Sequence, residues 1–385
     1  MLNQGIGRRK LLAATAVALL AACTAQKGPV RPIGPIEPTR PDANTLPSDS
    51  QRHRVALLVP LSGANAAAGQ SLANATTMAL LDTNAHNLRI TTYDTAAGAG
   101  PAAAKAIADG NRLILGPLLS EDIPAVAAAA RAAHVAVISY SNDEGRANRD
   151  VFIMGSLPSQ SIDRTIDYAK GKGMSHFAAL VPAGEYGQRA QSAFTASVRA
   201  SGGSVADIES FSRTPASLGA AVRRLRAKGN YDAVLVADGG RIAALAGPML
   251  KVAGSASPQL LGTELWSGET AVTSTPTLRG SWFSAVADER WRQFSGSYRS
   301  RFGNAPYRIA TLGYDSVLLT LRVARQWSPG TLFPTGRLYD REGFLGIDGA
   351  FRFRSNGAIE RALEVREVRA GGINVVSAAP GKFGD

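Results

Sequence analysis

Residues 112–143 constrain the fold of this chain more than any other stretch. The segment contains a short apolar run, a Gly-Pro turn, an Ala-rich stretch, a β-branched run at 135–138 and a polar turn at 139–143. This order predicts a strand, a helix and a second strand, with Ser120 as the helix N-cap and Glu121 in the first helical turn. Two parallel strands joined by a right-handed crossover bring both polar turns to one edge of the sheet. Open α/β folds bind ligands at that edge.

The alternation of strands and helices continues in two series. The first series predicts strands at 55–59, 88–94, 112–115, 135–138 and 151–154, and helices at 66–84 and 101–109. The second predicts strands at 177–181, 205–211, 231–237 and 259–261, with helices at 188–200, at 218–228 and before residue 252. This alternation indicates an α/β fold whose parallel sheets have helices on both faces. Two series in 385 residues indicate two lobes of ordinary domain size.

The first 22 residues predict a lipoprotein signal peptide. Residues 8–10 are basic and residues 11–22 are apolar, which is too short a run to span a bilayer. Residues 20–23 resemble a bacterial lipobox, and Cys23 is the single cysteine of the chain. We therefore expect cleavage before Cys23 and its lipidation with a fatty acid such as palmitate. The alternative is an ordinary signal peptide with an incidental cysteine.

Residues 23–53 predict a tether that carries the folded part away from the lipid. Six prolines lie between positions 29 and 47, and large apolar side chains are almost absent. Such a segment cannot bury enough surface to fold, and at about 3.1 Å per residue it could reach roughly 90 Å. Thr24 follows the lipidated position, which resembles an address to the periplasmic face of the outer membrane.

The charge and the polar motifs of the chain exclude several functions. The formal net charge is +12, and the signal peptide contributes three cations and no acids, so the mature chain carries 12 − 3 = +9. We expect no nucleic-acid partner, because the cations are dispersed and the chain is exported. The four histidines have no metal-ligand spacing, and the sequence has neither a nucleophile elbow nor a phosphate-binding loop. We predict that the protein is not an enzyme and has no metal or cofactor.

Five motifs in order resemble the type I periplasmic binding proteins, in the branch of the branched-chain amino-acid receptors. They are the strand and Ser-Gly turn at 55–63, the Gly-rich turn at 116–120, the Tyr-Gly pair at 186–187, the Tyr-Asp pair at 314–315 and a C-terminal hairpin within 349–368. The resemblance implies two Rossmann-like lobes that are joined by three crossovers around a cleft. It places lobe 1 at 54–158 and 285–347, and lobe 2 at 159–284 and 348–385.

Within this family, other pieces are similar to lipoprotein activators of penicillin-binding proteins. These pieces are residues 139–143, 152–155 and 262–266, together with Pro158 and the Tyr-Ala pair at 168–169. The resemblance implies an outer-membrane lipoprotein that binds and activates a penicillin-binding protein, a peptidoglycan synthase, without chemistry of its own. The alternative is a solute-binding lipoprotein of an ABC transporter for branched-chain amino acids, amides or another small polar ligand.

Polar and aromatic side chains after the predicted strands are the candidates for ligand contact in the cleft. In the receptors, hydroxyls and backbone amides at a helix N-terminus bind the ligand carboxylate, and Ser120 matches such a position. Glu121 stands where another hydroxyl is expected, and its carboxylate would repel a ligand carboxylate; the alternative is that Glu121 only stabilises the helix. For the others, ligand contact competes evenly with a structural turn role. The candidates are Ser62, Ser120, Glu121, Ser141, Asn142, Tyr186, Asp238, Glu264 and Trp266.

Overall fold

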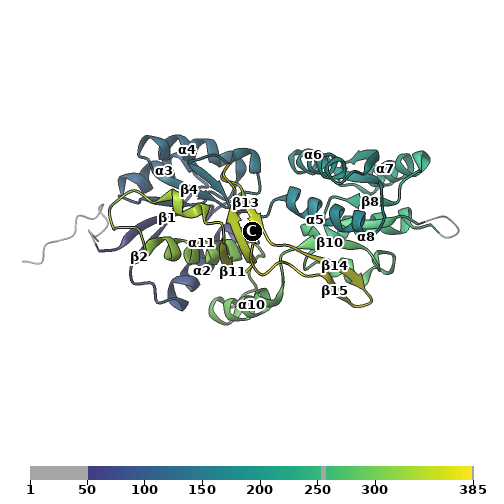
Figure 1. Ribbon diagram of the computed structural model, residues 1–385. Helices are drawn as coiled ribbons and strands as arrows, with labels where there is room; N and C mark the ends of the chain where they lie inside the picture. The colour runs from purple at the N-terminus through teal and green to yellow at the C-terminus, as the bar shows by residue number, and fades with distance from the viewer. Residues whose placement is uncertain (1–50, 253–256, 384–385) are drawn as a thin grey trace, which may run out of the picture. The chain divides into compact units, whose positions relative to one another are not determined.

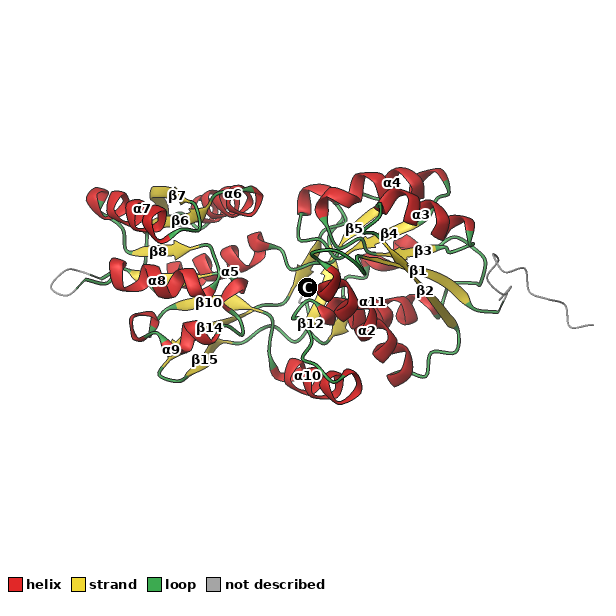
Figure 2. Cartoon of the chain, turned by 180° about the vertical axis from the view of Figure 1, so that it is seen from behind, coloured by secondary structure: helices red, strands yellow, loops and turns green. Residues whose placement is uncertain are grey.

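The computed structural model describes residues 51–252 and 257–383, and the predictions for Cys23, the signal peptide and nearly all of the tether lie outside these residues. The described part consists of two sheets flanked by helices and a small third sheet (Figures 1 and 2). The first large sheet is entirely parallel and the second is mostly parallel. The predicted α/β fold class is therefore confirmed.

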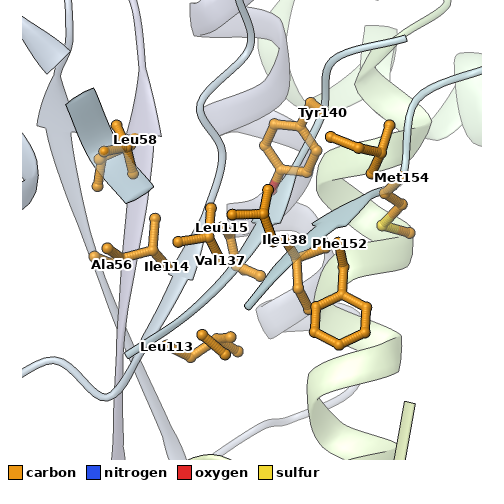
Figure 3. Packing of buried hydrophobic residues seen from close by; sticks show 14 of the residues in the cluster. Ala56, Leu58, Leu113, Ile114, Leu115, Val137, Ile138, Tyr140, Phe152 and Met154 are labelled. Atoms are coloured by element: carbon orange, nitrogen blue, oxygen red, sulfur yellow. The ribbon is translucent and has the colours of Figure 1, made fainter. Parts of the chain in front are cut away.

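The first sheet contains five strands in the order β2-β1-β3-β4-β5. They are β1 (His53–Val59), β2 (Leu88–Asp94), β3 (Leu113–Leu115), β4 (Ala136–Ser139) and β5 (Val151–Ile153). All five strands contribute to one apolar core, part of which Figure 3 shows. The central strands are apolar on both faces because helices cover both faces.

Two pairs of helices cover this sheet. α3 (Ala99–Ala108) and α4 (Ile123–Ala132) pack together on one face, and α2 (Ala66–Asp82) and α11 (Ala310–Ala324) pack together on the other (Figures 1 and 2). α10 (Glu289–Phe302) packs against α2 through Phe294 and Tyr298. Short 3-10 helices precede α4 and β5, namely η1 (Ser120–Asp122) and η2 (Glu144–Arg146).

The second sheet contains seven strands in the order β15-β14-β10-β9-β8-β6-β7. They are β6 (His176–Pro182), β7 (Ser204–Phe211), β8 (Ala233–Val236), β9 (Gln259–Gly262), β10 (Trp282–Ala285), β14 (Glu364–Arg369) and β15 (Gly372–Ser377). β14 runs antiparallel to β10, and β15 runs antiparallel to β14.

Alternate residues of the second sheet enter two separate cores. In β6, Ala178 and Leu180 face α7 (Pro215–Lys228) and α8 (Gly240–Leu250), whereas Phe177 and Ala179 belong to the core beneath α5 (Pro158–Gly171) and α6 (Glu185–Ala200). This division follows from the two-residue period of a strand. The remaining short elements of this part are η3 (Glu264–Trp266), α9 (Thr270–Ser274) and η4 (Pro276–Leu278).

The C-terminal segment divides between the two large sheets. β11 (Phe344–Gly346), β12 (Gly349–Phe353) and β13 (Ile359–Arg361) form the small antiparallel sheet, which follows η5 (Thr335–Tyr339). Phe351, Phe353 and Ile359 are buried in the core of the first sheet. We expected residues 348–385 to belong to lobe 2 and to hold one hairpin, but β12 pairs with β11 and β13, and only β14 and β15 join the second sheet. The buried aromatic rings account for this division, and the exact lobe boundaries stay a prediction.

The chain passes between the two large sheets three times. The crossings lie between β5 and α5, between β10 and α10, and between β13 and β14. We call them the first, second and third crossing. Their number agrees with the fold that the sequence predicts.

Several helices differ from their predicted positions. No helix is predicted at α5 (Pro158–Gly171), α10 or α11, and the predicted start of α7 is residue 218, whereas α7 begins at Pro215 after the N-cap Thr214. Proline at the first helical position after a capping threonine is a recognised start signal. Among the described residues, no helix combines the length and the apolar character that a membrane crossing requires.

Candidate ligand-binding site

A cavity of about 500 Å³ lies where the three crossings meet. The first crossing contributes Ser156 and Leu157, the second contributes Ala285 and Val286, and the third contributes Leu363. The turns at the carboxyl ends of β3, β4 and β9 supply other parts of the wall. This is the edge at which α/β sheets bind ligands, and the volume suits a small molecule.

The wall is apolar over much of its area. Leu118 and Leu119 come from the turn after β3, Leu265 from the turn after β9, and Ile309 and Leu312 from the start of α11. Polar groups interrupt this surface at a few places. A pocket of this kind holds a ligand by its apolar body and orients it by a few polar contacts.

Arg361, the last residue of β13, is the most unusual of the polar groups. Its side chain lines the cavity and is 5% exposed. Nη2 donates to the carbonyl oxygen of Met154 at 3.0 Å, but Nε and Nη1 have no hydrogen-bond partner among the described residues. Burial lowers the pKa of Arg361, although the charges of Asp348 and Asp315 oppose this shift. A buried guanidinium with unpaired donors is costly in a folded protein.

Arg308 and Asp348 form an ion pair in the same wall. Nη1 of Arg308 lies 2.5 Å from Oδ1 of Asp348, whose Oδ2 accepts a hydrogen bond from Thr311 at 2.8 Å. Nη2 of Arg308 is buried without a hydrogen-bond partner among the described residues. Behind this pair, burial and the charge of Asp348 raise the pKa of Asp315. Oδ1 of Asp288 lies 3.8 Å from Nη2 of Arg308, so two carboxylates face this guanidinium.

Glu264 lies at the second-lobe side of the cavity. Its Oε1 accepts a hydrogen bond from the hydroxyl of Tyr186 at 3.3 Å, whereas Oε2 is buried without a partner among the described residues. Burial raises the pKa of Glu264 to about 7. Burial and the nearby Glu264 also raise the pKa of Tyr186. The charge of this carboxyl group therefore changes near neutral pH.

Buried polar side chains also tie the crossings to one another. Gln160 of α5 donates to the carbonyl oxygen of Ile359 and accepts from the backbone N–H of Arg361. Ser161 donates to the carbonyl oxygen of Ser284 at 2.7 Å. These bonds fix the backbone around the cavity.

Three of the nine candidate residues line the cavity, namely Ser141, Asn142 and Glu264. Tyr186 contacts the cavity only through Glu264. Asp238 forms an ion pair with Arg213 at 2.8 Å, and Trp266 is a core residue whose Nε1 donates to the carbonyl oxygen of Asp238. These residues therefore have structural partners, and ligand contact by any of the nine stays a prediction.

The remaining candidates lie at the edge of the first sheet, outside the cavity wall. Ser62 donates to the carboxylate of Asp94 at 3.0 Å, and Glu121 is exposed. Ser120 is not the predicted N-cap, because η1 precedes α4, which begins at Ile123, and its hydroxyl donates to Oδ2 of Asp143 at 2.6 Å. Although burial alone would raise the pKa of Asp143, hydrogen bonds and nearby arginines lower it. An ionised Asp143 thus takes the hydroxyl that a ligand carboxylate would need.

A family model described as periplasmic binding protein matches residues 53–372. The chain belongs to the periplasmic binding protein family. The resemblance predicted from the sequence is confirmed, and the cavity of this periplasmic binding protein lies in the region where the family resemblance places a cleft. Its relatives by family and structure are binding proteins rather than enzymes.

Solved structures with the same fold come from several organisms. A putative branched-chain amino acid ABC transporter protein from Rhodospirillum rubrum is 20% identical, covers 84% of this chain and 100% of its own, and has a TM-score of 0.75. The C-domain of LpoA from Haemophilus influenzae, a regulator of PBP1A, is 18% identical, with coverages of 84% and 99% and a TM-score of 0.67. A solute binding protein from R. palustris in complex with benzoate is 17% identical, with coverages of 87% and 98% and a TM-score of 0.62. Similarity at this level shows the fold alone.

An uncharacterized protein of Rickettsia prowazekii is similar in sequence. It is 28% identical over 173 residues, which are 44% of this chain and 46% of that protein. The chain thus matches about half the length of this curated relative.

Sequence reasoning missed Arg361, Arg308 and Asp348. None of them follows a strand of the first or second predicted series. Only polar and aromatic residues after those strands were chosen as candidates. A weak signal was present, because Arg361 stands two residues after Ile359 and therefore on the same face of a strand as an apolar residue. Within the described ranges, no group of three His, Cys, Asp or Glu side chains is arranged to hold a metal ion.

Proposed function

We propose that this protein is a binding protein of the cell envelope whose cavity binds a small ligand, and that it acts by binding rather than by catalysis. The observation that carries this proposal is the cavity itself, which combines apolar walls with a few polar side chains, among them Ser141, Asn142 and Glu264. Solved relatives support it, since one holds benzoate and another holds isoleucine.

A thermal-shift screen tests ligand binding. Purified mature protein would be heated with amino acids, amides and aromatic acids, each at 10 mM. A ligand present at 100 times its dissociation constant adds about 2.7 kcal/mol of stability. A reproducible rise in Tm that saturates with the concentration of any one compound supports the proposal. If none of the compounds gives such a rise, the proposal is contradicted.

We propose as a second function that the protein docks on a penicillin-binding protein and stimulates peptidoglycan synthesis. The likeness to the LpoA C-domain supports this function, since that protein regulates PBP1A. The hydrogen bond between Ser120 and Asp143 also supports it, because it opposes an amino-acid carboxylate at the usual edge of the sheet. Lipidation at Cys23 and the Pro-rich tether would present the folded part from the outer membrane to a synthase.

Binding to a synthase and the rate of glycan polymerisation test this second function. The mature protein would be added to a purified bifunctional synthase, and pull-down, transglycosylase and transpeptidase rates would be measured. Association with a rate increase supports the proposal. Absence of association, with unchanged rates, contradicts it and leaves ligand delivery to a permease as the function to pursue.

Lipid attachment has a separate test. Radiolabelled palmitate should enter the wild-type protein and should not enter a Cys23→Ala variant. Fractionation of the envelope should then place the wild-type protein with the outer membrane. Labelling of both proteins, or of neither, would contradict the predicted anchor.

A further inference from the structure

We infer that the amino end of the first sheet is a docking surface for a membrane that contains anionic phospholipids. This basic end consists of the segments that precede β1 to β5, the last turns of α2, α3, α4 and α11, and residues 325–342. The inference goes beyond both proposed functions, because it concerns a surface of the first sheet and not the cavity.

The parallel strands bring these segments together. β1 and β2 pair from their first residues onward, and the backbone N–H of Arg112, just before β3, donates to the carbonyl oxygen of Arg54 at 2.9 Å. α11 ends at the same place, because the ring of Trp327 stacks on that of His53 with 4.2 Å between the centroids. The described chain also enters here, since residue 51 comes directly before β1.

The basic end carries a large excess of positive charge. Ten cations stand against three acids, so the formal charge of the described residues is 10 − 3 = +7. Asp82 with Arg301, and Arg341 with Glu342, leave this count unchanged. Four helix C-termini add about half a negative charge each, roughly −2 together, and do not cancel the excess. The residues counted are Arg52, Arg54, Arg89, Lys105, Arg112, Arg131, Arg149, Arg322, Arg325 and Arg337, and the acids Asp109, Asp150 and Asp340.

Three of these arginines line a second cavity, of about 260 Å³, at the end of α11 and beside η5. Arg322, Arg325 and Arg337 are exposed and form no ion pair among the described residues. Asp340 is the acid of this wall, and its Oδ1 already accepts a hydrogen bond from the backbone N–H of Glu342 at 3.1 Å. Because arginine binds phosphate oxygens through two parallel hydrogen bonds, this place suits the phosphate of a lipid headgroup.

The opposite edge of the same sheet carries the opposite charge. The last residue of β2 and the turns after β3 and β4 hold five acids and one arginine. An anionic surface therefore attracts the basic end and repels the carboxyl edge, which fixes the orientation of the protein. The cavity between the crossings then faces away from the membrane, since it lies at the carboxyl edge. The charged residues of this edge are Asp94, Glu121, Asp122, Asp143, Glu144 and Arg146.

Exposed leucines at the basic end favour a membrane over a soluble anionic polymer. Leu81, in the last turn of α2, is 67% exposed. Leu332 is 54% exposed and follows Thr331, whose carbonyl oxygen accepts a hydrogen bond from Trp327. Apolar side chains beside cations are the combination that enters the headgroup region of a bilayer. The predicted lipidation site, Cys23, precedes the basic end in the sequence, and a lipid with a basic patch holds a membrane more firmly than the lipid alone.

Sedimentation with lipid vesicles tests this surface. The mature chain without its lipid, residues 24–385, would be mixed with vesicles of phosphatidylcholine alone or of phosphatidylcholine with one quarter phosphatidylglycerol. The protein should bind only the anionic vesicles, and about 0.5 M NaCl should release it, because salt screens the attraction. A triple variant with Arg322→Gln, Arg325→Gln and Arg337→Gln should bind on the order of 100-fold more weakly, since each arginine near such a surface contributes about a factor of five.

A matched triple variant controls for net charge, and a dye reports the orientation. Arg223→Gln, Arg226→Gln and Arg241→Gln change exposed arginines of α7 and α8, and together should leave the affinity within about threefold of wild type. Both triple variants should keep the wild-type Tm. A cysteine introduced at exposed Ser328 or Ala97 would carry an environment-sensitive dye. Anionic vesicles should change the emission at Ser328, at the basic end, and not at Ala97, which follows β2.

The outcomes separate this surface from the proposed functions. Equal losses of affinity in the two triple variants, or a dye response at Ala97 as large as at Ser328, overturn the inference. If Leu81→Ser with Leu332→Ser leaves vesicle binding unchanged and dextran sulfate displaces the vesicles, the partner is a soluble anionic polymer and the inference is also overturned. Absence of binding to anionic vesicles overturns it as well, and leaves ligand binding, stimulation of a synthase and palmitate labelling to their own tests.

Discussion

Two arginines on either side of the third crossing are buried to a similar degree and have opposite surroundings. Arg361 on β13 is 5% exposed and Arg366 on β14 is 2% exposed. The guanidinium of Arg366 contacts carboxylate oxygens of Glu364 at 2.7 Å and Asp288 at 2.6 Å. That of Arg361 has one hydrogen bond, to the carbonyl oxygen of Met154.

The two arginines differ in the partners that they have at the crossings. Arg366 also donates to Ser267 and to the carbonyl oxygen of Val286, so it holds the second and third crossings together. Arg361 lines the cavity and keeps two donors without partners among the described residues. Two arginines that are equally buried therefore differ in how completely their donors are paired.

The largest expected effect is the loss of stability in Arg366→Met. This change leaves Glu364 and Asp288 without their cation, and breaking a buried pair in this way costs about 3–5 kcal/mol. Arg361→Met should stay within about 1 kcal/mol of the wild type or be more stable, because it removes a poorly paired charge. Urea unfolding followed by circular dichroism measures both. Equal losses in the two variants would mean that Arg361 is a structural residue like Arg366.

Asp348→Asn extends the comparison to Arg308. The variant keeps the shape of the side chain but removes the charge that pairs with Arg308 and attracts Arg361. We expect a loss of about 2–3 kcal/mol in the free energy of unfolding, since Arg308 is left with unpaired donors. Urea unfolding at pH 7 measures this loss.

Glu264→Gln tests the second unpaired group of the cavity. Burial raises the pKa of Glu264 from 4.5 to about 7, so the folded protein holds this proton more tightly than the unfolded chain does. Wild-type stability should therefore fall as the pH rises from about 4.5 to about 7, by on the order of 2 kcal/mol. Glutamine can still accept the hydrogen bond from Tyr186 and carries no charge.

The difference in the free energy of unfolding between the wild type and Glu264→Gln should depend on pH. Glu264→Gln should be more stable than the wild type at pH 8 and equal to it at pH 4, as measured by urea unfolding. The exposed Glu185 provides the control, because Glu185→Gln should change little at either pH. A constant difference at both pH values would rule out titration of Glu264 in this range.

The smallest effect on stability is expected at Ser120, whose hydroxyl donates to Asp143 at the edge of the first sheet. Ser120→Ala removes the hydrogen bond to Asp143 and should cost about 1 kcal/mol at pH 7. The pKa of Asp143 is below its ordinary value, so this contribution is present at neutral pH and is lost as the pH falls through that lowered pKa. Thermal unfolding at pH 7 and pH 3 measures it. Ligand affinity should not fall, and a large loss of affinity would make Ser120 a ligand contact.

The fold followed from the sequence where strands and helices alternate. The apolar runs of β1, β6 and β8 marked buried strands, and their order predicted the parallel sheets. Helices with a clear signal were still missed, since α5 places Ile162, Ile166 and Ala169 at a helical spacing. The sequence did not separate the small sheet from β14 and β15, because a hairpin motif does not state which core its aromatic residues enter.

The candidate site was predicted in part. Ser141, Asn142 and Glu264 line the cavity because they follow strands at the ligand-binding edge. Ser62 and Ser120 follow the same rule, but Asp94 and Asp143 accept their hydroxyl hydrogen bonds. The sequence places a side chain at the end of a strand, but it does not show which side chains will accept or donate its hydrogen bonds.

The sequence by itself determined the α/β class, the two lobes and the family, because hydrophobic periodicity and the order of short motifs are local properties. Only the tertiary structure decided which charges are paired. Arg361 and Arg366 stand five residues apart in one stretch of similar composition, and their different partners come from Met154 at the first crossing and Asp288 at the second. Contacts between crossings that are distant in the chain therefore decide whether a buried arginine is fully or only partly paired.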